Sequence, residues 1–182
     1  GSVVKQFTAA AILQLQEQGK LKVSDPICRY LETCPQSWQG ITLHHLLTHT
    51  SGIPNLTSLP GWDQKLAMLS YTRPELVALF RDLPLDFAPG EKFDYSNSGY
   101  TLLGVVVERV SGRGYYQYLD EKLFKPAGMT RTYGGDTRAL VPGRVTGYYS
   151  VGTDFISARL VSPTVDLGSS GVYSTVGDML RW

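Results

Sequence analysis

With 182 residues and 42% hydrophobic content, the chain is long enough for one domain with a substantial core and too short for two. Seventeen Lys and Arg against sixteen Asp and Glu leave a formal net charge of +1, so no overall field favours nucleic acid or an anionic membrane as a partner. The longest apolar stretches are interrupted well before the roughly 20 residues that a membrane span needs, and we expect no transmembrane segment.

The first helix is expected to begin near the start of the chain. Val4, Phe7, Ala11 and Leu15 recur at helical spacing, and Gly19 follows as a C-terminal stop. This pattern predicts about four helical turns.

Two cysteines lie in the segment that follows. A second, short helix is expected after Asp25 and Pro26, and a turn at its end can bring Cys28 and Cys34 within disulfide reach. The alternative is a pair of free thiols, because pairing depends on a redox compartment that the sequence does not disclose.

Capping patterns mark the helices in the middle of the chain. Thr42 can cap a short helix that Ser51 and Gly52 end. Thr72 and Glu75 match a capping box. The helix that follows the capping box has one apolar face, made of Leu76, Leu79, Phe80 and Leu83.

Two further helices precede a change of pattern. Residues 98–112 and 115–128 have apolar positions at helical spacing, each followed by a Gly or Pro stop. Residues 144–163 are rich in Val, Tyr, Phe, Thr and Gly with short alternations, which is typical of small strands or a hairpin.

The end of the chain combines a loop with a last capped helix. Residues 167–174 are a glycine-serine loop, and Thr175 with Asp178 can cap a helix that the chain end interrupts. Helices followed by a brief late sheet predict an α+β chain that is mainly helical, with residues 1–182 forming a single incomplete domain.

The candidate nucleophile is at the beginning of the first helix. Ser2 and Lys5 are three residues apart and share a helix face, and a nucleophilic serine needs a base within hydrogen-bond reach. The unpaired N–H groups and positive dipole of the first turn favour an alkoxide on Ser2 and a lowered pKa of Lys5. The alternative is a helix N-cap and a solvated lysine, which the spacing alone would favour.

A second polar motif accompanies this pair. Tyr95 and Asn97 are two residues apart in FDYSNSGY, a polar turn before a helix, where side chains can project into a cleft. A tyrosinate can relay a proton, and a carboxamide can orient a substrate amide.

Several segments along nearly the whole chain resemble the serine β-lactamase and penicillin-binding-protein superfamily, specifically its class C-like branch of β-lactamases, D-Ala-D-Ala carboxypeptidases and esterases. In chain order they are GSVVKQFTAAAILQL, HLLTHTSGI, PGEKFDYSNSGYTLLG, VERVSG, LFKPAGMTRT and GVYSTVGDMLRW. Gly-Ser is also what a cleaved tag leaves behind, but the resemblance places a serine at this position.

The resemblance implies a role for each of these residues. Ser2 would be the acylated nucleophile, Lys5 its proton acceptor, and Tyr95 the partner that shuttles a proton to the leaving group. Asn97 would orient the substrate, and the N–H of Ser2 would be half of the oxyanion hole. No cofactor is implied.

The resemblance also implies that the chain is a fragment. We expect a β-lactamase/transpeptidase-like fold with the helical region present and most of the central antiparallel sheet missing. In the family, a third motif, K-T-G or H-x-G, lies on a downstream strand and supplies the second oxyanion donor, and neither triplet occurs here. We therefore expect the fragment alone to be inactive and to expose apolar surface that the sheet normally covers.

The expected function is a serine hydrolase that acts through a covalent acyl-enzyme on an ester or amide. A β-lactam, a D-Ala-D-Ala or peptidoglycan-like peptide and a small ester all fit the same nucleophile. The alternative is a non-catalytic penicillin-binding, peptidoglycan-binding or sensing relative. Periplasmic or extracellular localisation is suggested by the family resemblance alone.

Other motifs are given no catalytic role. His45 and His49 stand four apart with His44 beside them, a spacing that can bind a metal. No H-E-x-x-H pattern or Cys partner accompanies them, so a capping or core role is favoured and no metal is expected. Asn55 begins an N-L-T glycosylation sequon and is assigned nothing.

Overall fold

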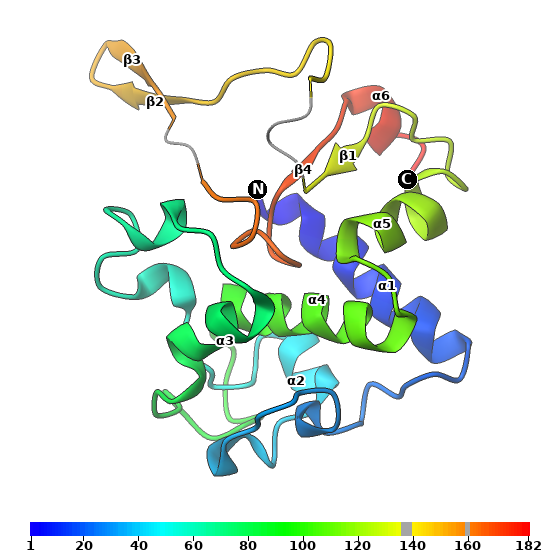
Figure 1. The fold of residues 1–182 in the computed structure, drawn as a ribbon, viewed down its shortest axis with the longest axis vertical. Helices are drawn as coiled ribbons and strands as arrows, with labels where there is room; N and C mark the ends of the chain where they lie inside the picture. Colours follow the sequence, from blue (N-terminus) through cyan, green and yellow to red (C-terminus); the bar gives the residue numbers. More distant parts are fainter. Residues whose placement is uncertain (136–139, 159–160) are drawn as a thin grey trace.

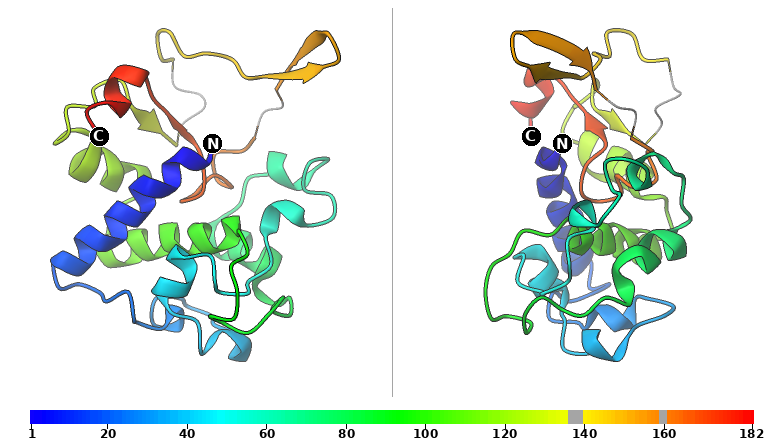
Figure 2. Two further views of the ribbon diagram at one scale, coloured as in Figure 1. Left: turned by 180° about the vertical axis from the view of Figure 1, so that it is seen from behind. Right: turned by 90° about the vertical axis from the view of Figure 1, so that its left-hand side faces the viewer.

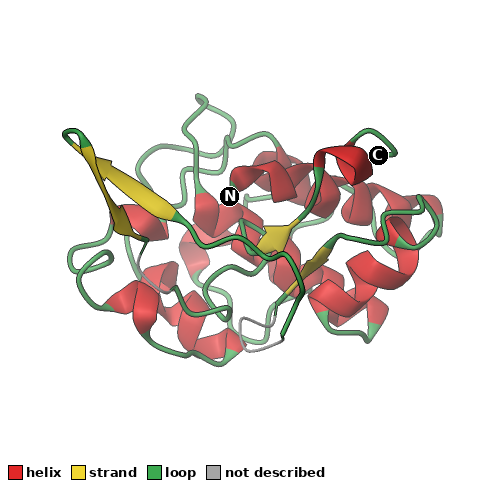
Figure 3. Cartoon of the chain, turned by 90° about the horizontal axis from the view of Figure 1, so that it is seen from above, coloured by secondary structure: helices red, strands yellow, loops and turns green. Residues whose placement is uncertain are grey.

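The computed structural model describes residues 1–135, 140–158 and 161–182, and helices dominate its regular structure (Figure 3). The α-helices are α1 (Lys5–Glu17), α2 (Leu43–Leu47), α3 (Arg73–Arg81), α4 (Asn97–Ser111), α5 (Tyr115–Leu119) and α6 (Val176–Met179). Shorter helical turns are η1 (Ser2–Val4), η2 (Ile27–Arg29), η3 (Gln36–Trp38), η4 (Leu56–Ser58), η5 (Leu66–Met68) and the π-helical η6 (Asp120–Phe124). The strands are β1 (Tyr133–Gly134), β2 (Tyr148–Val151), β3 (Asp154–Ser157) and β4 (Val172–Tyr173).

The centre of the fold is the contact between α1 and α4 (Figure 1). Phe7 and Leu15 of α1 are buried in the same cluster as Leu103 and Val107 of α4, while α2, α3 and α5 pack around α4. A loop of residues 165–171 also lies on α4, because a side chain at Gly104 would come within 2.7 Å of Leu167. The mainly helical α+β class expected from the sequence is confirmed.

The caps read from the sequence fix several of the helix ends. Thr42 accepts the N–H of His45 at 3.3 Å, and Thr72 forms the expected reciprocal pair with Glu75. Gly112 ends α4 in the left-handed conformation, and Thr175 accepts the N–H of Asp178 in α6. These helix starts and stops were therefore predictable from local chemistry.

Three expectations about local structure need correction. The helix predicted after Pro26 is only the single 3-10 turn η2. Helix α2 ends at Leu47, before the predicted stop at Ser51, because His49 already has a left-handed backbone. The predicted glycine-serine loop contains β4, which pairs antiparallel with β1 over just two residues of each strand.

The late strand prediction is confirmed as a hairpin. Strands β2 and β3 pair antiparallel, with Tyr148 opposite Ser157, while residues 159–160 of the predicted segment lie outside the described residues. The hairpin stands away from the helical body (Figure 2), and every residue of both strands is exposed.

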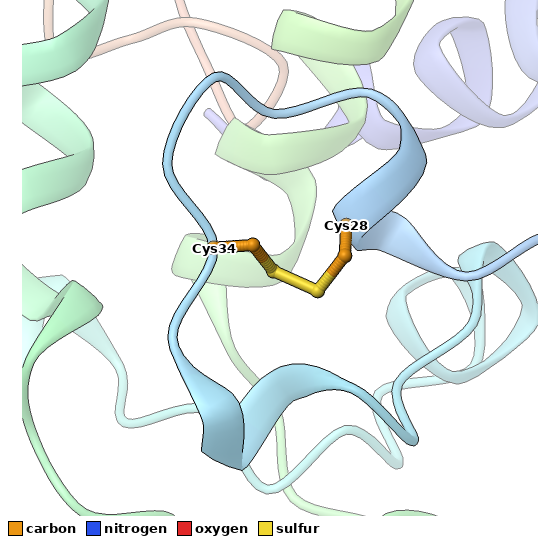
Figure 4. Close-up of a disulfide and its surroundings, with 2 residues drawn as sticks. All are labelled: Cys28 and Cys34. Atoms are coloured by element: carbon orange, nitrogen blue, oxygen red, sulfur yellow. A yellow bond between two sulfur atoms is a disulfide. The ribbon is translucent and has the colours of Figure 1, made fainter.

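The two cysteines are joined. Cys28, within η2, and Cys34, in the connection before η3, form a disulfide with a Cα–Cα distance of 5.3 Å (Figure 4). Of the two alternatives left open by the sequence, a disulfide and a pair of free thiols, the structure has the disulfide. Cross-linking so short a loop contributes about 2 kcal/mol to stability by the chain-entropy argument.

Apolar side chains are exposed beside the start of α1, on α6 and directly after α6. Val3 is 62% exposed, Val176 80% and Leu180 82%. These exposed side chains agree with the expectation of uncovered apolar surface. None of the described helices has the length and hydropathy to cross a membrane.

Candidate active site

Ser2 begins the turn that leads into α1, and its hydroxyl group is held from two sides. Ser2 Oγ shares a hydrogen bond of 2.6 Å with the hydroxyl of Tyr95 and accepts a longer one, 3.3 Å, from Lys5 Nζ. The turn η1 continues directly into α1, so the three-residue spacing brings Lys5 alongside Ser2 as predicted.

Lys5 is a buried lysine that uses all three of its N–H donors. Besides Ser2, its Nζ donates to Asn97 Oδ1 at 2.8 Å and to the carbonyl oxygen of Ser169 at 2.9 Å. Only 7% of the residue is exposed, and within the described residues no carboxylate lies at ion-pair distance. Burial lowers the pKa of Lys5, and the neighbouring Tyr95 partly opposes this effect. The amine of Lys5 therefore loses its proton more readily than that of an exposed lysine.

Tyr95 and Asn97 reach the pair from the start of α4. Ser96 caps this helix, accepting the N–H of Gly99 and donating to the carbonyl oxygen of Ile53. Asn97 is the first residue of the helix, and its Oδ1 lies 3.4 Å from the hydroxyl of Tyr95 as well as near Lys5. All four residues singled out in the sequence are therefore within one hydrogen-bonded cluster.

Asn55 is a member of the site that sequence reasoning missed. Its Oδ1 accepts the backbone N–H of Asn97 at 3.1 Å and the side-chain Nδ2 at 3.3 Å, while Thr57 Oγ1 accepts from Nδ2 at 3.2 Å. Both ends of the Asn97 carboxamide are thus engaged within the protein. The sequence shows Asn55 only as part of a sequon, which gives no sign of this contact.

The loop of residues 165–171 supplies the third partner of Lys5. Gly168 has a left-handed backbone, and a Cβ there would come within 2.0 Å of the carbonyl oxygen of Tyr100, so only glycine fits. The carbonyl of Gly168 accepts from Thr8 Oγ1 at 2.7 Å, which ties the loop to α1. Ser169 O is thereby held over Lys5. A backbone acceptor has no residue signature, so the sequence could not reveal it.

The histidines considered as metal ligands are placed in other roles. His45 completes the cap of α2, where its Nδ1 accepts the N–H of Thr42 at 3.3 Å. The ring of His49 lies against Tyr95 instead, with centroids 4.6 Å apart. In the ranges that the structure describes, no group of three metal-binding side chains occurs.

The geometry places the hydroxyl of Ser2 between two groups that can take up or give a proton, Lys5 and Tyr95. A serine next to a buried amine and a phenol is an arrangement that can form and resolve covalent acyl intermediates. The N–H groups of the first turn of α1 add positive potential beside Ser2.

Comparisons with known proteins match the whole chain. The beta-lactamase family model matches residues 1–182. PbpX of Bacillus subtilis strain 168 is 35% identical over 182 residues, spanning 100% of this chain and 44% of that protein. A crystal structure of a penicillin-binding protein from Bacillus halodurans is 34% identical with a TM-score of 0.88, covering 100% of this chain and 56% of that one.

An amidohydrolase is similarly close. The D-stereospecific amidohydrolase from Streptomyces sp. is 30% identical with a TM-score of 0.86, and the match covers 100% of this chain and 58% of that structure. The chain therefore spans about half the length of the relatives it matches.

Proposed function

Since this chain belongs to the beta-lactamase family, we propose that it carries the nucleophile of a serine hydrolase that acts through a covalent acyl-enzyme. The observation that supports this most directly is the position of Ser2 Oγ, which contacts both Tyr95 and Lys5. Residues 1–182 are then the helical part of an enzyme whose remaining sheet completes the site.

In the proposed reaction, Ser2 Oγ attacks the carbonyl carbon of an ester or amide and its proton passes to neutral Lys5. The bond from that carbon to the leaving oxygen or nitrogen then breaks, and Tyr95 passes the proton to the leaving group. Water attacks the acyl carbon in the second half of the reaction, and the serine hydroxyl is restored as the acid leaves. The lowered pKa of Lys5 supports this scheme, because it enlarges the neutral fraction near neutral pH.

Asn97 has two parts in this proposal. Its Oδ1 orients the amine of Lys5, and its Nδ2 can turn from Asn55 and Thr57 toward a substrate carbonyl. The N–H of Ser2 supplies one oxyanion donor, and the second comes from the strand that carries the family's third motif. The substrate is an acyl compound of the classes that the similar proteins suggest, a penicillin or an amide.

The test is intact-mass labelling of the full-length protein with a fluorophosphonate and, separately, with benzylpenicillin. The fluorophosphonate forms an Oγ–P bond and loses fluoride, whereas the penicillin opens its ring and adds its whole mass. We expect one adduct with each reagent, and no adduct in Ser2→Ala. Ser37→Ala, at an exposed serine of η3, is the matched control and should label like the wild type.

The outcomes separate the two functional classes. A penicillin adduct that is released over time indicates turnover, while an adduct that persists indicates a penicillin-binding or sensing relative. A folded protein that takes neither label contradicts the proposed function.

A further inference from the structure

His49 has an unusual backbone for its residue type. It follows α2 with a φ of 58°, and no other non-glycine residue in the described ranges has a positive φ. The left-handed conformation is unfavourable for a side chain with a Cβ, so contacts of this residue must stabilise it.

Those contacts go to three consecutive residues of the Tyr95 loop. The carbonyl oxygen of His49 accepts the N–H of Asp94 at 2.8 Å, and its Nδ1 accepts the N–H of Ser96 at 3.2 Å. Between these two hydrogen bonds, the imidazole ring lies on the ring of Tyr95, with centroids 4.6 Å apart and planes 32° apart. One residue thus holds the segment on both sides of Tyr95 as well as the ring itself.

The imidazole is in turn anchored to the core. Its ring centroid is 4.9 Å from that of Tyr100, at an angle of 31°, and Phe93 contacts it edge-on at 5.7 Å. Tyr100 is buried in α4, and its hydroxyl donates to the carbonyl oxygen of Leu47 at the end of α2. The ring that supports Tyr95 therefore rests on a fixed aromatic side chain.

The charge state of His49 suits this role. Nδ1 accepts a hydrogen bond, so the proton of the neutral ring is on Nε2. Burial lowers the pKa of His49, and the nearby Lys5 lowers it further. A neutral ring adds no positive charge beside the buried lysine.

We propose that His49 is a positioning residue that fixes the hydroxyl of Tyr95 beside Ser2, through its ring on Tyr95 and its hydrogen bonds to Asp94 and Ser96. This inference rests on the proposed function, in which Tyr95 carries the proton to the leaving group. The proposal gives His49, the first residue of the H-T-S-G segment, a role that is neither metal binding nor helix capping.

The experiment measures kcat and KM of the full-length protein on a p-nitrophenyl ester, with fluorophosphonate labelling of Ser2 as a second readout. The test variant is His49→Asn. Asparagine tolerates the left-handed backbone and keeps a polar acceptor, but it lacks the imidazole ring that contacts Tyr95. We expect kcat to fall about tenfold with KM nearly unchanged, because binding is kept and the proton path is disordered. His44→Asn, at the exposed neighbouring histidine, is the matched control.

A double-mutant cycle distinguishes positioning from general support of the fold. If His49 acts through Tyr95, His49→Asn adds little in a Tyr95→Phe background. Full additivity of the two losses, or a wild-type rate in His49→Asn, overturns the proposal. If His49→Asn does not fold, His49→Gly replaces it, since glycine adopts the left-handed backbone without strain and also removes the ring, and the same fall in kcat is expected.

A measurement that needs no activity separates this inference from the proposed function. Imidazole nitrogen NMR of the three histidines should show His49 protonated on Nε2 and titrating below the ordinary histidine pKa, with an NOE to the Tyr95 ring. An unlabelled wild type with these signals contradicts the hydrolase but not the positioning of Tyr95. A labelled wild type without them contradicts the role of His49.

Discussion

Ser2 and Lys5 are three residues apart on one stretch of helix, whereas the groups that surround Lys5 come from positions 92 and 164 residues further along the chain. The first half of the site is held by helical geometry, and the second half by the packing of α4 and the loop of residues 165–171 onto α1. Both halves contact the same amine.

The local and distant halves determine two different properties of the site: the proximity of Ser2 to Lys5, and the burial and hydrogen bonding of Lys5. Helical geometry brings Ser2 and Lys5 together, but by itself it leaves a lysine at a helix start open to water. Burial lowers the pKa of Lys5, and the acceptors on the distant segments direct its N–H groups. In the proposed reaction, the local half supplies the nucleophile and its base, whereas the distant half supplies Tyr95 and the acceptors that orient the amine.

The largest effect is expected from a change in the local half. Lys5→Met keeps an unbranched side chain but removes the amine, so acylation of Ser2 should slow about 1,000-fold, the loss typical of a general base. Stopped-flow or intact-mass labelling with the fluorophosphonate measures this rate. Lys22→Met, at an exposed lysine, serves as the control, and a Lys5→Met protein that labels at the wild-type rate would show that the amine is not the base.

Gly168→Ala disturbs the distant half and leaves the local pair intact. The new Cβ would lie 2.0 Å from the Tyr100 carbonyl oxygen, so the loop must shift and Ser169 O must move from Lys5. We expect a loss of about 3 kcal/mol in the free energy of unfolding from strain and overpacking. Acylation should slow about 100-fold, within the range for general-base catalysis.

Gly152→Ala is the matched control for this variant. Gly152 also has a left-handed backbone, but a Cβ there meets nothing within 4 Å. Urea unfolding should then show the backbone strain alone, about 1 kcal/mol, with an unchanged labelling rate. Equal losses in the two variants would mean that the close approach of Gly168 to α4 does not matter.

The pH profile reports on both halves together. Because the base must be neutral, kcat/KM should rise by about tenfold per pH unit below the pKa of Lys5 and level off above it. Burial lowers this pKa, so the plateau should begin below the ordinary lysine value of 10.5. In Gly168→Ala, where water reaches the amine, the plateau should move to higher pH. If the wild type and Gly168→Ala have the same pH profile, the loop of residues 165–171 does not influence the pKa of Lys5.

Asn55→Ala is expected to have the smallest effect. It removes the acceptor of two N–H groups of Asn97 but leaves Asn97 Oδ1 free to contact Lys5. Loss of one such supporting contact should slow acylation about fivefold and lower the free energy of unfolding by about 1 to 2 kcal/mol. Asn55→Asp keeps the acceptor and should restore most of the stability. If Asn55→Ala acylates at the wild-type rate, Asn55 does not contribute to the site, and the four residues recognised in the sequence are sufficient.

Much of the framework could be predicted because its signals are local. The caps at Thr42, Thr72 and Thr175 each act within three residues, so a short stretch of sequence determines them. The Ser2 and Lys5 pair is predictable for the same reason. Tyr95 and Asn97 are recognisable as a polar motif in a turn, but only the family resemblance connected them to Ser2, which spacing along the chain could not do.

The remaining members of the site lack such signals. Asn55 is recognisable only through its contact with Asn97, 42 residues away. The left-handed backbone of His49 is also invisible in the sequence, since glycine is the residue that usually marks this conformation. Strand β4 was missed because two paired residues within a glycine-rich stretch form no alternating pattern.

The carbonyl oxygen of Ser169 has a practical consequence for mutational mapping. An alanine scan replaces side chains one at a time and leaves every carbonyl in place, so Ser169→Ala keeps the atom that Lys5 contacts. Such a scan would rank position 169 as dispensable. Natural sequence variation at this position would not reveal the contact either, because every residue type has the same backbone carbonyl. The contact becomes visible only when the chain itself is altered, for example by an amide-to-ester exchange that weakens this acceptor.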